Sequence, residues 1–132
     1  MDLAEWTEQY IKHRDLFFKK LVEIKKQNNL VEAVFKDKTQ FYFMVPALDE
    51  EIFNKIKDKN NKIIVCDYEK KNIKFVADNW EEFVKISNLL IIFVNPVSGK
   101  KLLLNPQSHN KVADPSTIKE GLFSMFDAGL ES

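Results

Sequence analysis

The sequence has little cysteine, glycine or proline, and each shortage excludes a class of site. Among 132 residues there are one cysteine, three glycines and four prolines. The single cysteine, Cys66, excludes an internal disulfide, and with only His13 and His109 as histidines the chain lacks the ligand set of structural zinc. Three isolated glycines cannot form a glycine-rich phosphate-binding loop. We therefore expect no metal and no cofactor.

Charge of one sign and long hydrophobic runs are also missing. Twenty basic and twenty acidic side chains cancel, which argues against a surface for nucleic acid or anionic lipid, because both need a clustered positive excess. The longest apolar run, LLIIFV at residues 89–94, is far shorter than a membrane span. The first residues, MDLAEWTEQY, have no apolar core of a signal peptide. We expect a cytoplasmic protein without a nucleic-acid or membrane partner.

The chain does have enough apolar residues to build a core. Hydrophobic residues make up 45% of it and include eleven phenylalanines, which is the composition of an ordered globular protein. A chain of this length is typical of one domain. A single domain over residues 1–132 is the prediction.

One long helix is predicted at the start of the chain. Apolar residues recur at helical spacing, with one turn skipped at His13 and Arg14, and Asn28 and Asn29 are predicted to end the helix. The apolar positions are Leu3, Trp6, Tyr10, Phe17, Leu21 and Ile24.

Three units follow, each predicted as two strands and then a helix. The first has strands at 30–35 and 41–45 and a helix at 48–57. The second has strands at 62–68 and 73–77 and a helix that Asp78 opens and that buries Trp80 and Phe83; the third has strands at 89–94 and 100–104 and a helix at 118–126, capped from Asp114. Because hairpin strands pair antiparallel, the predicted fold class is α+β: a long N-terminal helix followed by three hairpin-plus-helix units, which form a mainly antiparallel sheet covered by helices.

The stretch GKKLLLNPQSHNK, residues 99–111, offers the first candidate site. Asn105 and Pro106 are typical of structural punctuation after a strand, because asparagine bonds its own following backbone and proline fixes the bend. Turn chemistry does not account for the segment from Gln107 to Lys111, which is predicted as a loop. Ser108 and His109 are therefore candidate binding residues.

Tyr42 is a further candidate binding residue, because it lies between Phe41 and Phe43 on one strand. Successive strand residues point to opposite faces, so one face exposes Tyr42 to a partner, or the sheet is covered on both sides and Tyr42 belongs to the core.

No catalytic residue is predicted. Ser108 and His109 are adjacent in the sequence, which seldom places an imidazole against the neighbouring hydroxyl. Cys66 lies in the middle of a strand, where a buried, unreactive thiol is the favoured interpretation. The acidic pairs, Glu50 with Glu51 and Glu81 with Glu82, each lie in the first turn of a predicted helix, where negative charge is stabilising.

The order of these segments resembles the N-terminal domain of the SseB-like, or enhanced serine sensitivity, family of bacteria. The similarity extends over about residues 14–123 and rests on LFFKKL at 16–21, a strand ending in Val45-Pro46, KFVADNWEEF at 74–83, LLLNP at 102–106 and DPSTIKEGL at 114–122. The resemblance implies a bacterial α+β domain with a binding or regulatory role and no established reaction or cofactor.

Three functional hypotheses follow. The first is a non-enzymatic bacterial binding or regulatory module of the SseB-like type, which acts through contacts with another protein; a homodimer is left open. The second is an immunity or antitoxin-like protein that caps a toxin. The third is a small hydrolase.

Overall fold

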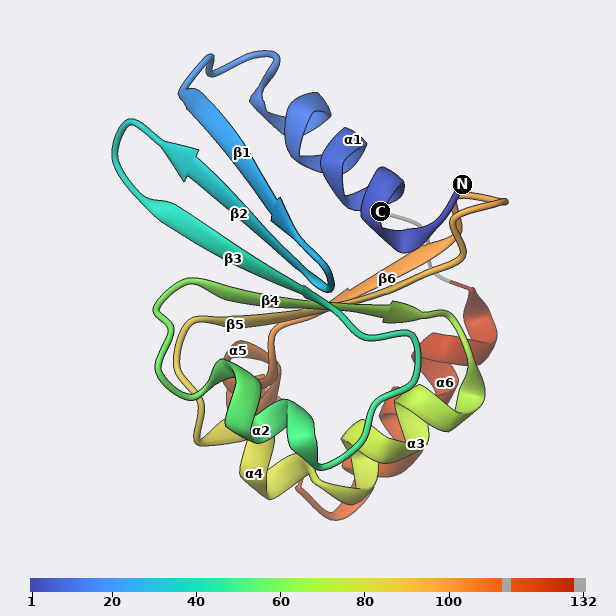
Figure 1. The fold of residues 1–132 in the computed structure, drawn as a ribbon. Helices are drawn as coiled ribbons and strands as arrows, with labels where there is room; N and C mark the ends of the chain where they lie inside the picture. The colour runs from blue at the N-terminus through green and yellow to red at the C-terminus, as the bar shows by residue number, and fades with distance from the viewer. Residues whose placement is uncertain (113–114, 130–132) are drawn as a thin grey trace.

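A six-stranded mixed sheet forms the centre of the protein. The computed structural model describes residues 1–112 and 115–129 (Figure 1). The strands lie side by side in sequence order; β1, β2 and β3 pair antiparallel, β3, β4 and β5 pair parallel, and β6 is antiparallel to β5. Their bounds are β1 Leu21–Gln27, β2 Leu30–Phe35, β3 Thr39–Met44, β4 Lys62–Asp67, β5 Leu89–Val94 and β6 Lys101–Leu104.

Helices cover both faces of this sheet (Figure 1). One face carries α1, and the other carries α2 to α6. The bounds are α1 Leu3–Asp15, α2 Glu51–Ile56, α3 Lys70–Asp78, α4 Trp80–Val84, α5 Pro106–Val112 and α6 Ile118–Ala128, with a short 3-10 helix, η1, at Pro115–Thr117. Among the described residues, no helix has the length and apolar character needed to cross a membrane.

The sheet separates two hydrophobic clusters. In β4, Ile63 and Val65 face α1, whereas Ile64 and Cys66 face the other helices, and all four are buried. The continuous apolar runs of β4 and β5 are thus explained by burial on both faces, as in other parallel strands. This confirms the α+β class and the burial of Cys66.

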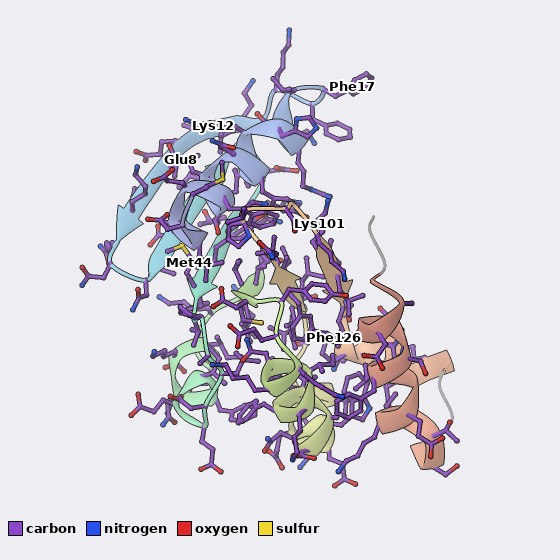
Figure 2. The ribbon with its side chains drawn as sticks, turned by 90° about the vertical axis from the view of Figure 1, so that its right-hand side faces the viewer. Glu8, Lys12, Phe17, Met44, Lys101 and Phe126 are labelled. Atoms are coloured by element: carbon purple, nitrogen blue, oxygen red, sulfur yellow. The ribbon has the colours of Figure 1, made fainter. Side chains whose placement is uncertain are left out.

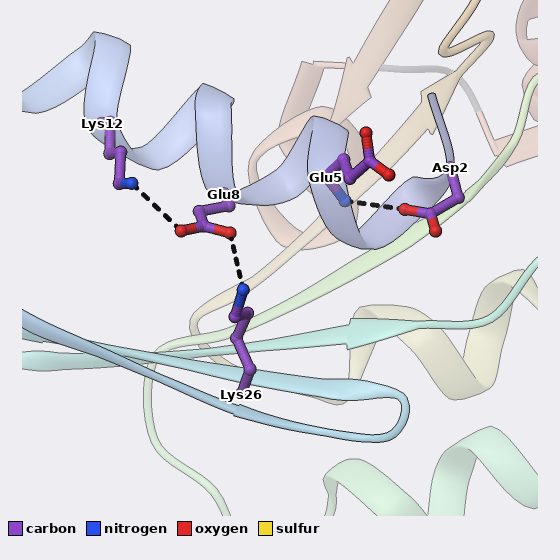
Figure 3. Close-up of polar contacts among 5 residues, drawn as sticks. All are labelled: Asp2, Glu5, Glu8, Lys12 and Lys26. Atoms are coloured by element: carbon purple, nitrogen blue, oxygen red, sulfur yellow. Dashed lines mark hydrogen bonds and ion pairs between the residues drawn. The ribbon is translucent and has the colours of Figure 1, made fainter.

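The first helix is held by polar contacts at its start and along its side (Figure 3). Asp2 caps it by accepting a hydrogen bond from the Glu5 N–H at 2.8 Å. The Glu8 carboxylate bonds Lys12 of the same helix and Lys26 of β1, each at 3.0 Å. These two bonds hold the pKa of Glu8 below its ordinary value.

The prediction of one helix from Leu3 to Ile24 is wrong. The helix ends at Asp15, the chain turns, and residues 21–27 form β1. Asn28 and Asn29 do not end a helix but form the two-residue turn of the β1–β2 hairpin, where Asn28 has φ of 30°. Asparagine tolerates this left-handed region, which explains its place in the turn.

The predicted strand at 73–77 is also wrong, because these residues lie in α3. Ile73, Val76 and Ala77 are buried at helical spacing. The helix is needed here because β4 and β5 pair parallel, and a parallel pair requires a crossover. The second hairpin-plus-helix unit is therefore absent, and the centre of the sheet is parallel.

Other predicted elements are present with small differences. Trp80 and Phe83 are buried, as predicted. Asp78 ends α3 and does not cap α4, whose N-cap position is Asn79. Asp114, the predicted cap of the last helix, lies outside the described residues.

Candidate protein-binding surface

Exposed apolar side chains gather where α1 turns into β1. Six large hydrophobic side chains are exposed in the described part of the chain, and four of them belong to this turn and the first residues of β1. We call them the tip surface: Leu16, Phe17, Phe18 and Val22. Figure 2 shows Phe17 at one end of the molecule, pointing away from it. Several exposed apolar side chains close together along the chain mark an interaction surface more often than scattered single residues do.

Asp15 explains why these side chains face outward. Its two carboxylate oxygens accept hydrogen bonds from the N–H groups of Lys20, at 2.8 Å, and Leu21, at 2.9 Å. Its carbonyl accepts a third from Lys19, which adopts a left-handed conformation with φ of 53°. The ends of the turn are thus fastened to Asp15, and the intervening Leu16, Phe17 and Phe18 form a loop on its outer side.

A cavity of about 240 Å³ opens beside the tip surface. It lies between the end of α1 and the β2–β3 hairpin, and Phe18 forms part of its wall. The other lining residues are Ile11, Arg14, Asp15, Lys20, Phe35, Asp37, Lys38, Gln40 and Tyr42.

The rim of this cavity carries positive charge that is only partly neutralised. Lys20 pairs with Asp37 at 3.4 Å. The Arg14 guanidinium lies 5.4 Å from the centre of the Tyr10 ring, and the Lys38 ammonium lies 5.9 Å from that of Phe35. Within the described residues neither cation pairs with a carboxylate. The site can therefore take a group that is negatively charged and accompanied by apolar surface.

Tyr42, a predicted binding residue, lines this cavity but is 3% exposed. Its hydroxyl donates a hydrogen bond of 2.8 Å to Gln40 Oε1. Burial raises the pKa of this hydroxyl. Of the two interpretations of the aromatic strand, the structure shows the covered sheet: Tyr42 belongs to the core beneath α1 and reaches solvent only through the cavity.

The segment predicted as a loop, from Gln107 to Lys111, is helical and belongs to α5. Asn105 Oδ1 accepts a hydrogen bond from the Ser108 N–H at 3.1 Å, so Asn105 acts as an N-terminal cap and Pro106 occupies the first turn. A proline followed by polar residues starts a helix as readily as a loop, so the residue pattern alone does not separate the two.

Ser108 and His109 do not form a site together with Tyr42. The helix α5 lies on the opposite face of the sheet from α1 (Figure 1). Ser108 is exposed, whereas the His109 ring meets the Trp80 ring edge-on at 5.9 Å. Asn110 Oδ1 accepts a bond from Trp80 Nε1 at 3.0 Å. These contacts fasten α5 to α4.

Cys66 and Asp67 are neighbours at the end of β4, and their side chains point to opposite faces of the sheet. Cys66 is fully buried, which raises the pKa of its thiol. Asp67 ends the parallel strand β4, and burial, with Glu69 nearby, raises the pKa of its carboxyl. In the part of the chain that the structure describes, no three histidine, cysteine or acidic side chains are grouped so that they could hold a metal ion.

The tip surface was not predicted from the sequence, because Phe17 also fits the apolar stripe of a long helix. The signal was available: Leu16, Phe17 and Phe18 are consecutive, and three consecutive side chains cannot share one helix face. Such a run, placed next to the skipped turn at His13 and Arg14, indicates the end of a helix.

Comparison of the chain with protein-family models, curated proteins and solved structures gives no significant match. The similarity to SseB-like proteins thus stays a prediction.

Proposed function

We propose that the protein is a non-enzymatic binding module that recognises another protein through its tip surface. One observation carries this proposal: four exposed apolar residues lie together at one end of the folded molecule, whereas most other large apolar side chains are buried or partly buried. The four are Leu16, Phe17, Phe18 and Val22. An isolated patch of this kind is stabilised when a partner removes it from water.

The cavity favours a protein over a lipid surface as the partner. Lipid contact needs only a protruding apolar loop with cations, whereas a cavity walled by Phe18 and floored by Tyr42 can receive a single side chain. Arg14 and Lys38 at its rim suit a carboxylate. The partner we expect presents apolar and acidic side chains on one surface.

Site-specific photo-crosslinking tests this proposal. A photoreactive phenylalanine analogue replaces Phe17 in one variant and Val97, in the β5–β6 turn, in another; both native side chains are 88% exposed, so the two probes are equally accessible. In extract of the source cells, we expect the probe at 17 to crosslink one protein. Excess unmodified chain should suppress this product, and Arg14→Glu should reduce it.

Three outcomes would contradict the proposal. Equal crosslinking from positions 17 and 97 would mean that exposure alone explains capture. If Arg14→Glu left the amount of crosslinked product unchanged, the cavity would not take part in binding the partner. Binding to phosphatidylglycerol vesicles without a protein product would show that the tip surface contacts lipid.

The identity of the captured protein separates the two non-enzymatic hypotheses. A regulatory module of the SseB-like type requires a cellular partner whose activity changes on binding. An immunity protein requires a toxin whose active site the tip surface covers. An activity assay of the captured protein, with and without the chain, distinguishes these cases.

A further inference from the structure

The strand β1 has a free edge. The sheet order places β2 on one side of β1 and no strand of the described chain on the other. A free edge presents unpaired backbone N–H and C=O groups, which are a template for another strand. The exposed Val22 joins this edge to the tip surface, but the residues considered below, Glu23 to Lys26, are separate from it.

Hydrogen bonds of the neighbouring hairpin determine which backbone groups of β1 are free. Met44 donates to the Asn29 carbonyl and Phe35 to the Lys38 carbonyl, each at 2.8 Å. Since residues of an antiparallel strand alternate in direction, Val31 and Ala33 bond toward β3, and Leu30 and Glu32 bond toward β1.

The same alternation applies to β1. Glu32 lies opposite Lys25 and Val34 opposite Glu23, so the backbone groups of Glu23 and Lys25 are used by β2. The groups of Ile24 therefore point to the free edge.

Among the registers centred on residues 23–26, one suits a second copy of the chain. When two copies of one strand pair antiparallel, a two-fold axis passes through a residue that lies opposite itself. Axes through Glu23, Lys25 or Lys26 would place like charges directly opposite each other, which is destabilising. An axis through Ile24 instead places isoleucine opposite isoleucine, and Glu23 of each copy opposite Lys25 of the other.

We infer that β1 pairs with β1 of a second copy about an axis at Ile24, and that two sheets thereby become one sheet of twelve strands. This goes beyond the proposed function, because it assigns a second surface with a different occupant. The irregularity at Val22 ends the regular pairing on one side, so the shared ladder is short. Because the interface is small, we expect a weak dimer whose population rises with protein concentration.

The lysines of β1 leave room for this pairing. Edge lysines often prevent strand addition, but Lys26 is drawn onto the α1 side by Glu8 at 3.0 Å (Figure 3). Lys25 lies 3.8 Å from Glu23 on its own strand. In the dimer each Glu23 carboxylate gains a second lysine from the facing copy.

A charge swap tests the register. Sedimentation equilibrium from about 10 µM to about 1 mM, the range in which a small interface associates, should show a monomer–dimer equilibrium. Glu23→Lys and Lys25→Glu should each weaken it by about tenfold, because two attractive pairs become repulsive. The double variant Glu23→Lys/Lys25→Glu should restore the native constant to within about threefold.

Controls keep the result specific. Glu69→Lys makes the same charge change in an acid–lysine pair two residues apart, Glu69 with Lys71, away from β1, and should leave association unchanged. Melting curves of all variants show that each one folds. A monomer at every concentration, single variants that dimerise normally, or a double variant that fails to recover would each overturn the inference. None of these variants alters the tip surface, so failure here leaves crosslinking from position 17 unaffected.

Discussion

At the scale of single residues, Asp15 holds the turn that carries the tip surface. Each of its carboxylate oxygens accepts one backbone N–H, from Lys20 and from Leu21. Asn in its place keeps one acceptor and loses the other. We therefore expect Asp15→Asn to lower the free energy of unfolding by about 1–2 kcal/mol and to reduce crosslinking from position 17. Urea unfolding followed by tryptophan fluorescence measures the first effect. Unchanged stability would show that the carboxylate does not hold the turn.

Trp80 stabilises the fold through its buried ring and through a hydrogen bond of its Nε1, and two substitutions separate these effects. Its ring is buried in the larger hydrophobic cluster, and its Nε1 donates to Asn110. Trp80→Ala should cost about 3 kcal/mol or more, as large aromatic truncations in cores do. Trp80→Phe keeps much of the ring and should cost clearly less in the same urea titration. If the alanine variant were as stable as the parent, Trp80 would not be a core residue.

At the scale of secondary-structure elements, α5 depends on its cap. Asn105→Ala removes the acceptor for the Ser108 N–H and should cost about 1 kcal/mol. Ser108→Ala, at an exposed position, should change stability by less than about 0.5 kcal/mol. His109→Ala loses the edge contact with Trp80 and should cost about 1 kcal/mol. Thermal unfolding of the three variants checks this order; equal losses at 105 and 108 would contradict the cap.

The elements that sequence patterns predicted well are those with one dominant signal. The six apolar residues of β5 and the aromatic run of β3 are strands in the structure, as expected. The prediction of a strand at 73–77 failed because this segment has apolar residues at both two- and four-residue spacing. Such a short segment fits a strand and a helix equally well. Tertiary context decided: a parallel β4–β5 pair needs a helix between its strands.

The candidate site was predictable only in part. Tyr42 does reach the cavity, but the cavity exists because α1 stops at Asp15 and β2 and β3 form a hairpin opposite it. Single-sequence spacing does not specify that arrangement, since Phe17 also fits the helical stripe. Ser108 and His109 are candidates because turn chemistry does not explain them. The ring of His109 contacts Trp80 of α4, and Asn110 bonds Trp80 from 30 residues away in the sequence. Spacing along the chain does not predict such contacts.

The contact between α3 and α6 gives stability a dependence on pH. Asp78 bonds Lys119 of α6 at 2.9 Å and Lys74 of its own helix at 2.6 Å. These lysines lower the pKa of Asp78 from 3.8 to about 2. Since the folded pKa is depressed, the stabilisation is present above pH 3.8 and is lost as pH falls toward 2.

Asp78→Asn should therefore be less stable than the parent at pH 6, and the difference should shrink between pH 4 and pH 2. Urea midpoints of both proteins across this range measure it. Asp58→Asn, in the turn after α2, is the matched control, because in the described structure its carboxylate forms no ion pair. A constant difference between parent and Asp78→Asn at every pH would show that the lysine contacts are not the cause.

At the scale of the whole molecule, folding and recognition are assigned to different side chains. Phe83 and Phe93 are fully buried, whereas Phe17 is 88% exposed. Phenylalanine content alone therefore does not separate core from binding surface. The separation follows from position: the core residues lie on elements packed on both sheet faces, and Phe17 lies in a turn beyond the end of α1.

Phe17→Ser tests this division of roles. Because the ring is mostly in water and contacts the Phe18 ring, with 5.6 Å between the ring centres, its removal should change the free energy of unfolding by less than about 0.5 kcal/mol. The same variant should bind less to a hydrophobic-interaction column and lose capture of the partner protein. Val97→Ser removes an equally exposed side chain from the β5–β6 turn and should keep that capture. A large loss of stability in Phe17→Ser would instead make this ring part of the fold, and capture that survives the substitution would move recognition away from the tip surface.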